Sequence, residues 1–491
     1  MNNSFTSLEN QSTRNLTDVF LRASSHQIGM RYLYLFGILF LFALLPIFLL
    51  LSSSRLLGLE ESFSSSFALT SASHGIIFVF FIFIPFFHTI GTNLWLPKLL
   101  NYKNDSLTKL NNLSFLLYNA AFIVFITGSI YSPQLTDWKL YKIEYYDSFG
   151  IELVLLAIGL VVLSTIISSI RTIVIIYGIK RLKFSDSKSK ILLNSFYLSS
   201  FIYIIALPVL LMYILMILSE IKFGLGILDS KMGGDVVFSM HLFWIGVHPL
   251  FYALFIFAAG ILSHFTISKI ELYNKRISAC FGIIAIFGLL SWGQHLYFTG
   301  LSEKYSLIFS FFGMLPIIPI SYLIVILLMN WFKRSYSDSN QRLFVIFSLL
   351  SVVLGSITGM MLITPLINSQ LHNSIFISGH FHLLLFGFIG STIMILVLHL
   401  WESIWKIKYH KIIMKISIFC LFGGLLLSEG TKLFSGLRGV SNFSFYSQLN
   451  FGVELINSIG LFFVLQGVVM IVFNLLYHLY RSRNRDEEIR V

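Results

Sequence analysis

Long apolar runs separated by short polar segments dominate the sequence. A transmembrane helix needs about 20 mainly apolar residues, and twelve runs meet this requirement. They lie at roughly 32–52, 66–96, 112–131, 150–178, 192–219, 236–266, 277–299, 304–331, 343–366, 374–401, 411–430 and 452–480. Several exceed the minimum length, which indicates tilted helices or helices that extend beyond the hydrocarbon layer. The pattern therefore predicts an all-α integral membrane protein built as a bundle of twelve transmembrane helices.

The distribution of Lys and Arg between these runs tests the count, because cytoplasmic loops of membrane proteins carry an excess of positive charge. With the N-terminus inside, twenty-five of the 34 Lys and Arg fall in the tails and inner loops, eight fall in the outer loops, and Arg171 lies within a run. If one helix were missed or wrongly added, all later loops would change sides and this bias would disappear. We therefore predict an N-in and C-in topology.

The chain shows no division into separate folded domains. We predict a polar N-terminal tail over residues 1–30, one membrane domain over residues 31–480 and a charged C-terminal tail over residues 481–491. No charged and apolar leader with a cleavage pattern precedes the first run, so no removable signal is expected. Neither a Gly/Ser-rich linker nor a convincing internal repeat interrupts the membrane domain.

The composition excludes several classes of protein. Hydrophobic residues make up 56% of the chain and charged residues only 11%, against roughly 25% charged residues in an average soluble domain. The two cysteines, Cys280 and Cys420, cannot form a disulfide framework or a thiolate metal site, so any metal must be held by histidine. The net charge of +12 is spread between apolar runs and forms no contiguous patch, so no nucleic acid partner is expected.

Histidines are numerous for so apolar a chain, and ionisable groups inside a membrane are functional candidates because their burial is costly. In the predicted topology, six of the thirteen histidines lie in the outer half of the membrane, on four different helices: His74, His241, His248, His295, His380 and His382. Other single histidines are interpreted as members of polar networks or interfaces: His88, His264, His399, His410 and His478.

The spacing of these residues limits what they can bind. On a helix His380 and His382 point about 200° apart, so they cannot chelate one metal, but each can serve a different one. His248 and Tyr252 are four residues apart and share a helix face. Gln294 and His295 are adjacent, and both could reach a cavity at the end of their helix. The pattern indicates two cofactors side by side.

At this point the motifs resemble those of a known family, the catalytic subunit I of haem-copper oxidases, over about residues 26 to 475. The matching segments occur in the family's order and spacing: SHGIIFVFFIFIPFFHTIGTNLWLP from Ser73, HLFWIGVHPLFY from His241, WGQHLYFTG from Trp292, GSITG from Gly355 and SGHFHLLLFG from Ser378. The HLFWIGVHPLFY segment resembles the most specific signature of the family.

The resemblance implies a role for each site residue. It makes His74 and His382 the axial ligands of a low-spin haem, and His380 the ligand of a high-spin haem. It places copper, with non-haem iron as the alternative, at His248, His295 and position 294. Further matching positions are Tyr252, the tyrosine that supplies an electron and a proton during O–O cleavage, and His372 and Arg438, near the haem propionates. Trp244, one turn before His248, is either a packing residue or part of the cofactor site.

Several positions depart from the family pattern. The first of two consecutive histidines is replaced by Gln294, whose amide oxygen is a poorer ligand for Cu(I) than imidazole. Leu250 stands where the family has a proton-relay glutamate, and the segment from Ile317 to Trp331 has no lysine. Asn373 follows His372 where an aspartate is common, and the paired propionate arginines are reduced to Arg438. Efficient proton pumping is therefore not expected.

These features predict a respiratory terminal oxidase subunit that uses two haems of unassigned type and copper to reduce O2 to water. One alternative is a nitric oxide reductase-like enzyme, which the loss of an imidazole at Gln294 favours and Tyr252 opposes. Another is a transporter or non-catalytic protein on the same fold, which would have no need for the predicted haem ligands.

The predicted partners follow from what the chain lacks. It has no CxxxC copper-dimer motif and no CxxCH haem-attachment motif, so a subunit II-like partner is expected to pass electrons from cytochrome c, unless quinol is oxidised directly. Membrane lipid and further small membrane subunits are also expected. The predicted location is the prokaryotic plasma membrane, with the mitochondrial inner membrane as the alternative.

Overall fold

The computed structural model describes residues 23–52, 73–99, 107–131, 149–181, 187–228, 230–297, 299–300, 302–334, 336, 338–441 and 450–488. Within these ranges, twelve helices are long and apolar enough to cross a membrane. The predicted all-α fold with twelve spans is thereby confirmed. Residues 66–72 of the predicted second run and residues 1–22 of the predicted N-terminal tail lie outside the described residues.

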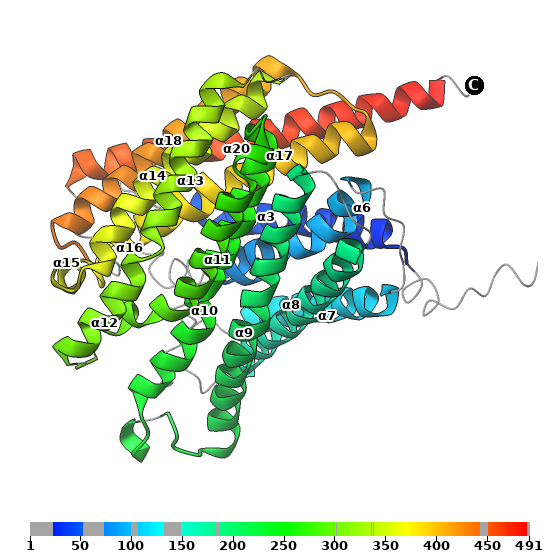
Figure 1. Cartoon of the computed structure of the whole chain (residues 1–491). Coiled ribbons are helices and arrows are strands. Elements are labelled where there is room, and N and C mark those ends of the chain that lie inside the picture. The colour runs from blue at the N-terminus through cyan, green and yellow to red at the C-terminus, as the bar shows by residue number, and fades with distance from the viewer. Residues whose placement is uncertain are drawn as a thin grey trace, which may run out of the picture.

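The spans consist of the following helices in chain order, visible as tilted rods in Figure 1. The first span is α3 (Ser25–Ser52). The second span contains η2 (Ile77–Phe83), α5 (Ile84–Phe86), η3 (Phe87–Trp95) and α6 (Leu96–Leu99). The third to sixth spans are α7 (Thr108–Tyr131), α8 (Phe149–Arg181), α9 (Ser187–Phe223) and α10 (Val236–Thr266). The seventh to ninth are α11 (Asn274–Leu290) with η7 (Ser291–Leu296); α12 (Glu303–Met314) with α13 (Ile317–Lys333); and α14 (Ser339–Ile363).

The short helix α15 (Pro365–Leu371) then precedes the tenth span, which consists of α16 (Phe376–His382), η8 (Leu383–Gly390), α17 (Ser391–Leu400) and η9 (Trp401–Trp405). The last two spans are α18 (Lys411–Leu437) and α20 (Phe451–Glu488). Because α3 begins at Ser25 and α20 continues to Glu488, helix extends into both segments that the sequence interpretation assigns to polar tails. The boundaries of those tails remain predictions.

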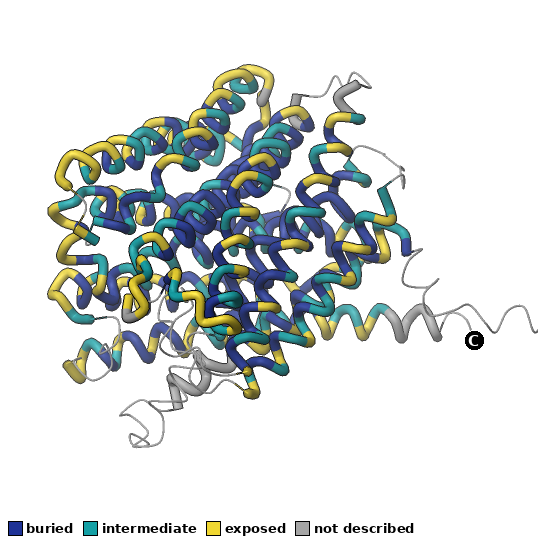
Figure 2. The backbone as a smooth tube through the Cα atoms, turned by 90° about the horizontal axis from the view of Figure 1, so that it is seen from below, coloured by how far each residue is buried: buried dark blue, intermediate teal, exposed yellow. Residues whose placement is uncertain are grey.

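The helices pack mainly on their neighbours in sequence. α7 lies on α8, α8 on α9 and α9 on α10, while α18 packs along α20, and α20 returns to contact α3. Residues on the inner sides of the helices are buried, and exposed residues follow the outer faces of the bundle (Figure 2). An apolar outer surface of this kind suits lipid, because the bilayer is the solvent for these faces.

The second span lies at the centre of the bundle. In its most apolar window 94% of the residues are buried, against 33% in the third span. Two of its segments, η2 and η3, are π-helical, and η8 gives the tenth span the same feature. π-Helical turns are rare and often occur at functional sites. Among the described residues, the two spans that carry the predicted haem-ligating histidines are therefore also the two with π-helical turns.

Glycine allows α18 and α20 to approach closely. A Cβ added at Gly424 would lie 2.5 Å from the carbonyl oxygen of Gly460 and 2.6 Å from the backbone nitrogen of Val464. Small residues at such crossings let helix backbones pack together in a membrane. The close pair holds α18, and with it the buried side chains of its C-terminal half, against the rest of the bundle.

We expect Gly424→Ala to destabilise the protein, because the added methyl group meets backbone that cannot move without separating α18 from α20. Overpacking of this kind costs about 1–3 kcal/mol. Thermal unfolding of the detergent-solubilised protein measures the loss. The matched control is Gly423→Ala, where an added Cβ meets nothing within 4 Å. Equal unfolding temperatures for the two variants would contradict the close approach.

Candidate functional site

His74 and His382 face each other across the second and tenth spans. Their ring centroids are 6.1 Å apart and their planes are inclined by 71°. The Nδ1 atom of His74 lies 3.0 Å from the carbonyl oxygen of Ala43, which can only accept a hydrogen bond, so Nδ1 is the donor. The Nδ1 atom of His382 lies 3.0 Å from Oε2 of Glu429. With Nδ1 occupied in this way, Nε2 of each ring keeps a lone pair for a metal.

This separation fits one iron held between two imidazoles. Two metal–nitrogen bonds of about 2 Å, added to the distance from each ring centroid to its ligating nitrogen, give about the observed distance between the two centroids. Phenylalanine rings surround the pair: Phe78 lies 4.7 Å from His74, and Phe386 lies 5.5 Å from His382 and 4.7 Å from Phe78. An apolar enclosure of this kind suits a flat macrocycle and excludes water.

A second group of aromatic residues lies between α10 and η7. Nε2 of His295 is 3.0 Å from Nδ1 of His248, and the His295 ring stacks on Trp244 with a centroid distance of 3.4 Å and an angle of 6°. The Tyr252 ring lies 5.3 Å from that of His248. Two metal–nitrogen bonds of about 2 Å at close to a right angle would place the nitrogens about 3 Å apart. The donor pair therefore fits one copper or iron ion.

The helix type of η7 determines the direction of the Gln294 side chain. η7 is a 3₁₀-helix with three residues per turn, so Gln294 and His295 diverge by about 120°. Oε1 of Gln294 is buried without a hydrogen-bond partner among the described residues, and a Cβ added at Gly313 of α12 would lie 3.3 Å from it. Gln294 is thus directed toward α12, whereas His295 is directed toward α10.

His380 lies on the opposite side of its helix from His382. Its Nδ1 atom is 2.8 Å from Oγ1 of Thr358 on α14, and Gly359 allows the ring to lie close to that helix, since a Cβ there would be 3.3 Å from Cε1 of His380. The two histidines contact different helices, α14 and α18. The spacing argument, which assigns them to two different cofactors, agrees with this arrangement.

The two residues expected near haem propionates lie at the edge of the site. His372 follows α15, and its ring centroid is 5.9 Å from that of His295. Arg438 is the C-cap of α18, and its guanidinium lies 4.3 Å above the Phe434 ring. A backbone hydrogen bond from Ile375 to Val440 joins the segment after α18 to the start of the tenth span. His372 therefore lies beside His295, whereas Arg438 lies at the end of α18, just before the segment that is joined to the start of the tenth span.

Tyr297 fixes the segment that follows η7. Its hydroxyl donates a hydrogen bond to the carbonyl oxygen of Ile363, 3.1 Å away at the end of α14. Burial raises the pKa of Tyr297 to about 12, so the hydroxyl stays protonated at neutral pH and the bond persists. The position of His295 is thereby tied to α14, the helix that also supports His380.

Sequence interpretation missed two charged residues of the site. Glu429 is 2% exposed and Lys432 is 6% exposed, and both lie inside α18. The apolar run at 411–430 ends before Lys432 and so predicts that this lysine is one of the eight in outer loops, but the structure buries it in a span. Two ionisable residues three positions apart, Glu429 and Lys432, are the sequence signal that could have revealed them.

His88 lies in a polar network, as the sequence interpretation expects. Its ring contacts the hydroxyls of Thr172, Ser169 and Ser200 at 3.4 Å.

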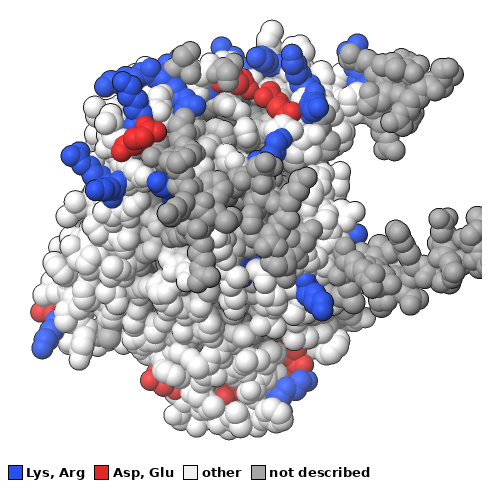
Figure 3. All heavy atoms as spheres, turned by 45° about the vertical axis from the view of Figure 1, so that its right-hand side comes forward, with Lys and Arg blue, Asp and Glu red and all other residues white. Residues whose placement is uncertain are grey.

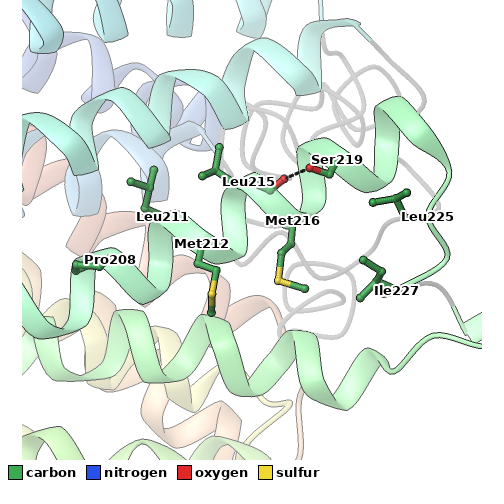
Figure 4. A pocket seen from close by; sticks show the side chains of 8 residues that line it. All are labelled: Pro208, Leu211, Met212, Leu215, Met216, Ser219, Leu225 and Ile227. Carbon is green, nitrogen blue, oxygen red and sulfur yellow. Dashed lines mark hydrogen bonds between the residues drawn. The ribbon is translucent and has the colours of Figure 1, made fainter.

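An apolar groove of about 360 Å³ lies elsewhere, along α9 and the segment that follows it (Figure 4). Its walls contain no histidine and one polar side chain; they are formed by Pro208, Leu211, Met212, Leu215, Met216, Ser219, Leu225 and Ile227. Among the described residues, no three His, Cys, Asp or Glu gather as a metal-binding group. The candidate chemistry therefore rests on the paired histidines and not on this groove.

Comparison with known proteins agrees with the geometry. The family model described as Cytochrome C and Quinol oxidase polypeptide I matches residues 27–472. Cytochrome c oxidase subunit 1 of Candida albicans is 24% identical over 444 residues, covering 87% of this chain and 82% of the relative. The subunit of the same name from Pecten maximus is 25% identical over 382 residues, covering 75% and 79%.

A solved structure extends the agreement to the fold. A heme-copper terminal oxidase dimer studied by cryo-EM has a chain that superposes with a TM-score of 0.76 at 14% identity, covering 92% of this chain and 84% of that one. The protein is an integral membrane oxidoreductase of the haem-copper terminal oxidase class. It belongs to the cytochrome c and quinol oxidase polypeptide I family.

Proposed function

We propose that the protein is the catalytic subunit of a respiratory oxidase that reduces O2 to water with electrons supplied by a partner subunit. The observation that carries this proposal is the arrangement of five histidines as three separate donor sets. His74 and His382 would hold a low-spin haem, His380 a high-spin haem, and His248 with His295 a copper ion. When bound, these groups supply electron transfer and O2 activation.

Protein side chains would then orient the groups and handle protons. Trp244 stacks on His295 and limits rotation of its ring. Tyr252 carries a phenolic proton beside His248, where it can serve as a proton donor. Leu250, which is fully buried on α10, offers no carboxylate at the relay position, so we propose that proton pumping is weak.

The proposed orientation places both termini on the inner side of the membrane and the metal-binding histidines toward the outer side. Figure 3 supports it, because on the visible face most Lys and Arg gather at one end of the bundle, and only a few charged side chains are visible elsewhere. The proposed location is an energy-transducing membrane, prokaryotic or mitochondrial. A subunit II-like partner with a copper centre or haem would deliver electrons from cytochrome c, unless quinol is the donor.

A nitric oxide reductase-like activity is the second candidate. The direction of Gln294 favours it, because position 294 adds no ligand to the pair formed by His248 and His295, and a non-haem iron could replace copper there. Tyr252 favours the oxidase, since its phenol lies beside the same metal position.

The deciding experiment is analysis of the purified complex for haem, copper and iron, followed by exposure of the reduced complex to O2 and to NO in parallel. Two haems with one copper, and consumption of O2, support the oxidase. Two haems with one additional non-haem iron, and conversion of NO to N2O, would replace it with the reductase. Absence of haem would reject both proposals.

Replacement of Gln294 by histidine tests the third ligand position. Because the side chain at 294 points toward α12, we expect the copper content and CO-rebinding kinetics of Gln294→His to match those of the original protein. Copper analysis after dialysis against a chelator provides the measurement. If Gln294→His retained about tenfold or more copper than the original protein, position 294 would reach the metal. A change of this size is typical when the environment of a metal ligand changes.

A further inference from the structure

A buried ion pair lies directly behind His382. Glu429 accepts hydrogen bonds from Nζ of Lys432 at both carboxylate oxygens, at 2.9 Å and 3.1 Å. Oε2 of the same carboxylate is 3.0 Å from Nδ1 of His382, and Ser428 donates to Oε1 at 3.3 Å. Each oxygen of the Glu429 carboxylate thus lies within hydrogen-bond distance of at least one nitrogen donor. This is the arrangement that a buried carboxylate requires to remain ionised.

The chemistry of the three groups determines which atoms carry protons. An ammonium group has only donors and a carboxylate only acceptors. Lys432 also approaches Nδ1 of His382, at 3.2 Å. If Lys432 donated to Nδ1, the imidazole proton would lie on Nε2 and the ring could not ligate iron through that atom. If Nδ1 donates to Glu429, Nε2 is free for the metal.

The three proposed haem ligands differ in their hydrogen-bond partners. His74 faces the backbone carbonyl of Ala43, His380 the hydroxyl of Thr358, and His382 the carboxylate of Glu429. Only His382 has full charges of both signs within 3.2 Å of its Nδ1 atom. A carboxylate partner makes a ligating imidazole more basic, and a cation at similar distance acts in the opposite direction.

We propose that Glu429 and Lys432 are positioning residues of the low-spin haem: the carboxylate orients His382 and favours the oxidised iron, and the ammonium group limits that preference. The inference rests on the proposed function, because it assigns His382 to a haem. It goes further by assigning a role in setting the reduction potential to two residues of α18 that do not ligate the iron.

The test is whether substitutions of Glu429 and of Lys432 shift the midpoint potential of the low-spin haem in opposite directions. Glu429→Gln keeps a hydrogen-bond acceptor but leaves the Lys432 charge uncompensated, so the midpoint potential of the low-spin haem should rise. Lys432→Met leaves the carboxylate uncompensated, so the potential should fall. We expect at least a tenfold change in the reduction equilibrium in each case, which is about 59 mV for one electron. Potentiometric titration of the low-spin α-band measures both.

A purely structural role would not give shifts of opposite sign, because both substitutions would loosen the same helix contact. The double variant E429Q/K432M removes both charges and should return toward the original potential, and it remains testable if either single variant folds poorly. The control is Glu220→Gln: Glu220 is also buried in a span, but its carboxylate accepts from the backbone N–H of Ile227. It should leave the potential unchanged.

The outcomes separate the inference from the proposed function. If the original protein shows the EPR signal of a bis-histidine low-spin haem and the two single variants shift its potential in the same direction or not at all, the positioning role is wrong and the haem assignment stands. If the original protein lacks that signal, the proposed function itself fails. Opposite shifts with unchanged haem content support both.

Discussion

His380→Ala is expected to remove the high-spin haem signal and leave the low-spin haem in place. His380 and His382 contact different helices, and the Nδ1 atom of His380 is supported by Thr358 alone among the hydrogen bonds described for it. Loss of that imidazole deprives one haem of its iron ligand without touching His74, His382 or Glu429. Reduced-minus-oxidised and CO-difference spectra should show no CO-binding haem, and O2 uptake should fall to background.

The control for this substitution is His399→Ala in the same span. His399 lies on α17, where its ring contacts Phe265 at 5.2 Å, and it belongs to neither histidine group. Both haem signals should persist in that variant. Loss of both haems, or of neither, in His380→Ala would contradict the assignment of two separate haem sites.

Tyr252→Phe is expected to leave haem and metal content intact while slowing O2 reduction. The phenylalanine ring fills the same space beside Gly288, where an added Cβ would lie 2.7 Å from Tyr252, so packing is retained and only the hydroxyl is lost. Removing a positioned proton donor costs about 10²–10⁴-fold in rate. Oxygen uptake per haem measures the effect.

Tyr118→Phe serves as the comparison, because that hydroxyl donates to the carbonyl oxygen of Phe81 and lies in the third span. O2 uptake per haem should match that of the original protein. If Tyr252→Phe retained full O2 uptake, Tyr252 would have no role in the reaction.

Most of the fold could be predicted because apolar run length and loop charge are local properties of a membrane chain. Twelve runs predict twelve spans, and the structure contains them. The π-helical turns could not be predicted, since η2 and η8 are wholly apolar and the glycines of η3 and η8 have counterparts in the α-helical α10 and α18.

The site was predictable where residues act along one helix and not where they meet across helices. The separation of His380 from His382 follows from helix periodicity. The direction of Gln294 depends on η7 being a 3₁₀-helix, and the contact of Glu429 with His382 joins residues 47 positions apart. The sequence alone places Lys432 at a helix end because charges usually terminate apolar runs; its burial depends on a partner three residues earlier on the same helix.

The Glu429–Lys432 pair also bears on how the chain is inserted into its membrane. Glu429 lies eight residues before the end of α18, about 12 Å along the helix axis, and a lone charge near a helix centre adds about 2.5–3.5 kcal/mol to insertion. Formation of the ion pair within α18 lowers this penalty before any contact with His382 exists. We therefore expect an isolated α18 that carries E429Q/K432M to be inserted by the translocon only slightly more often than the original helix, so the paired charges serve redox chemistry at little cost to biogenesis.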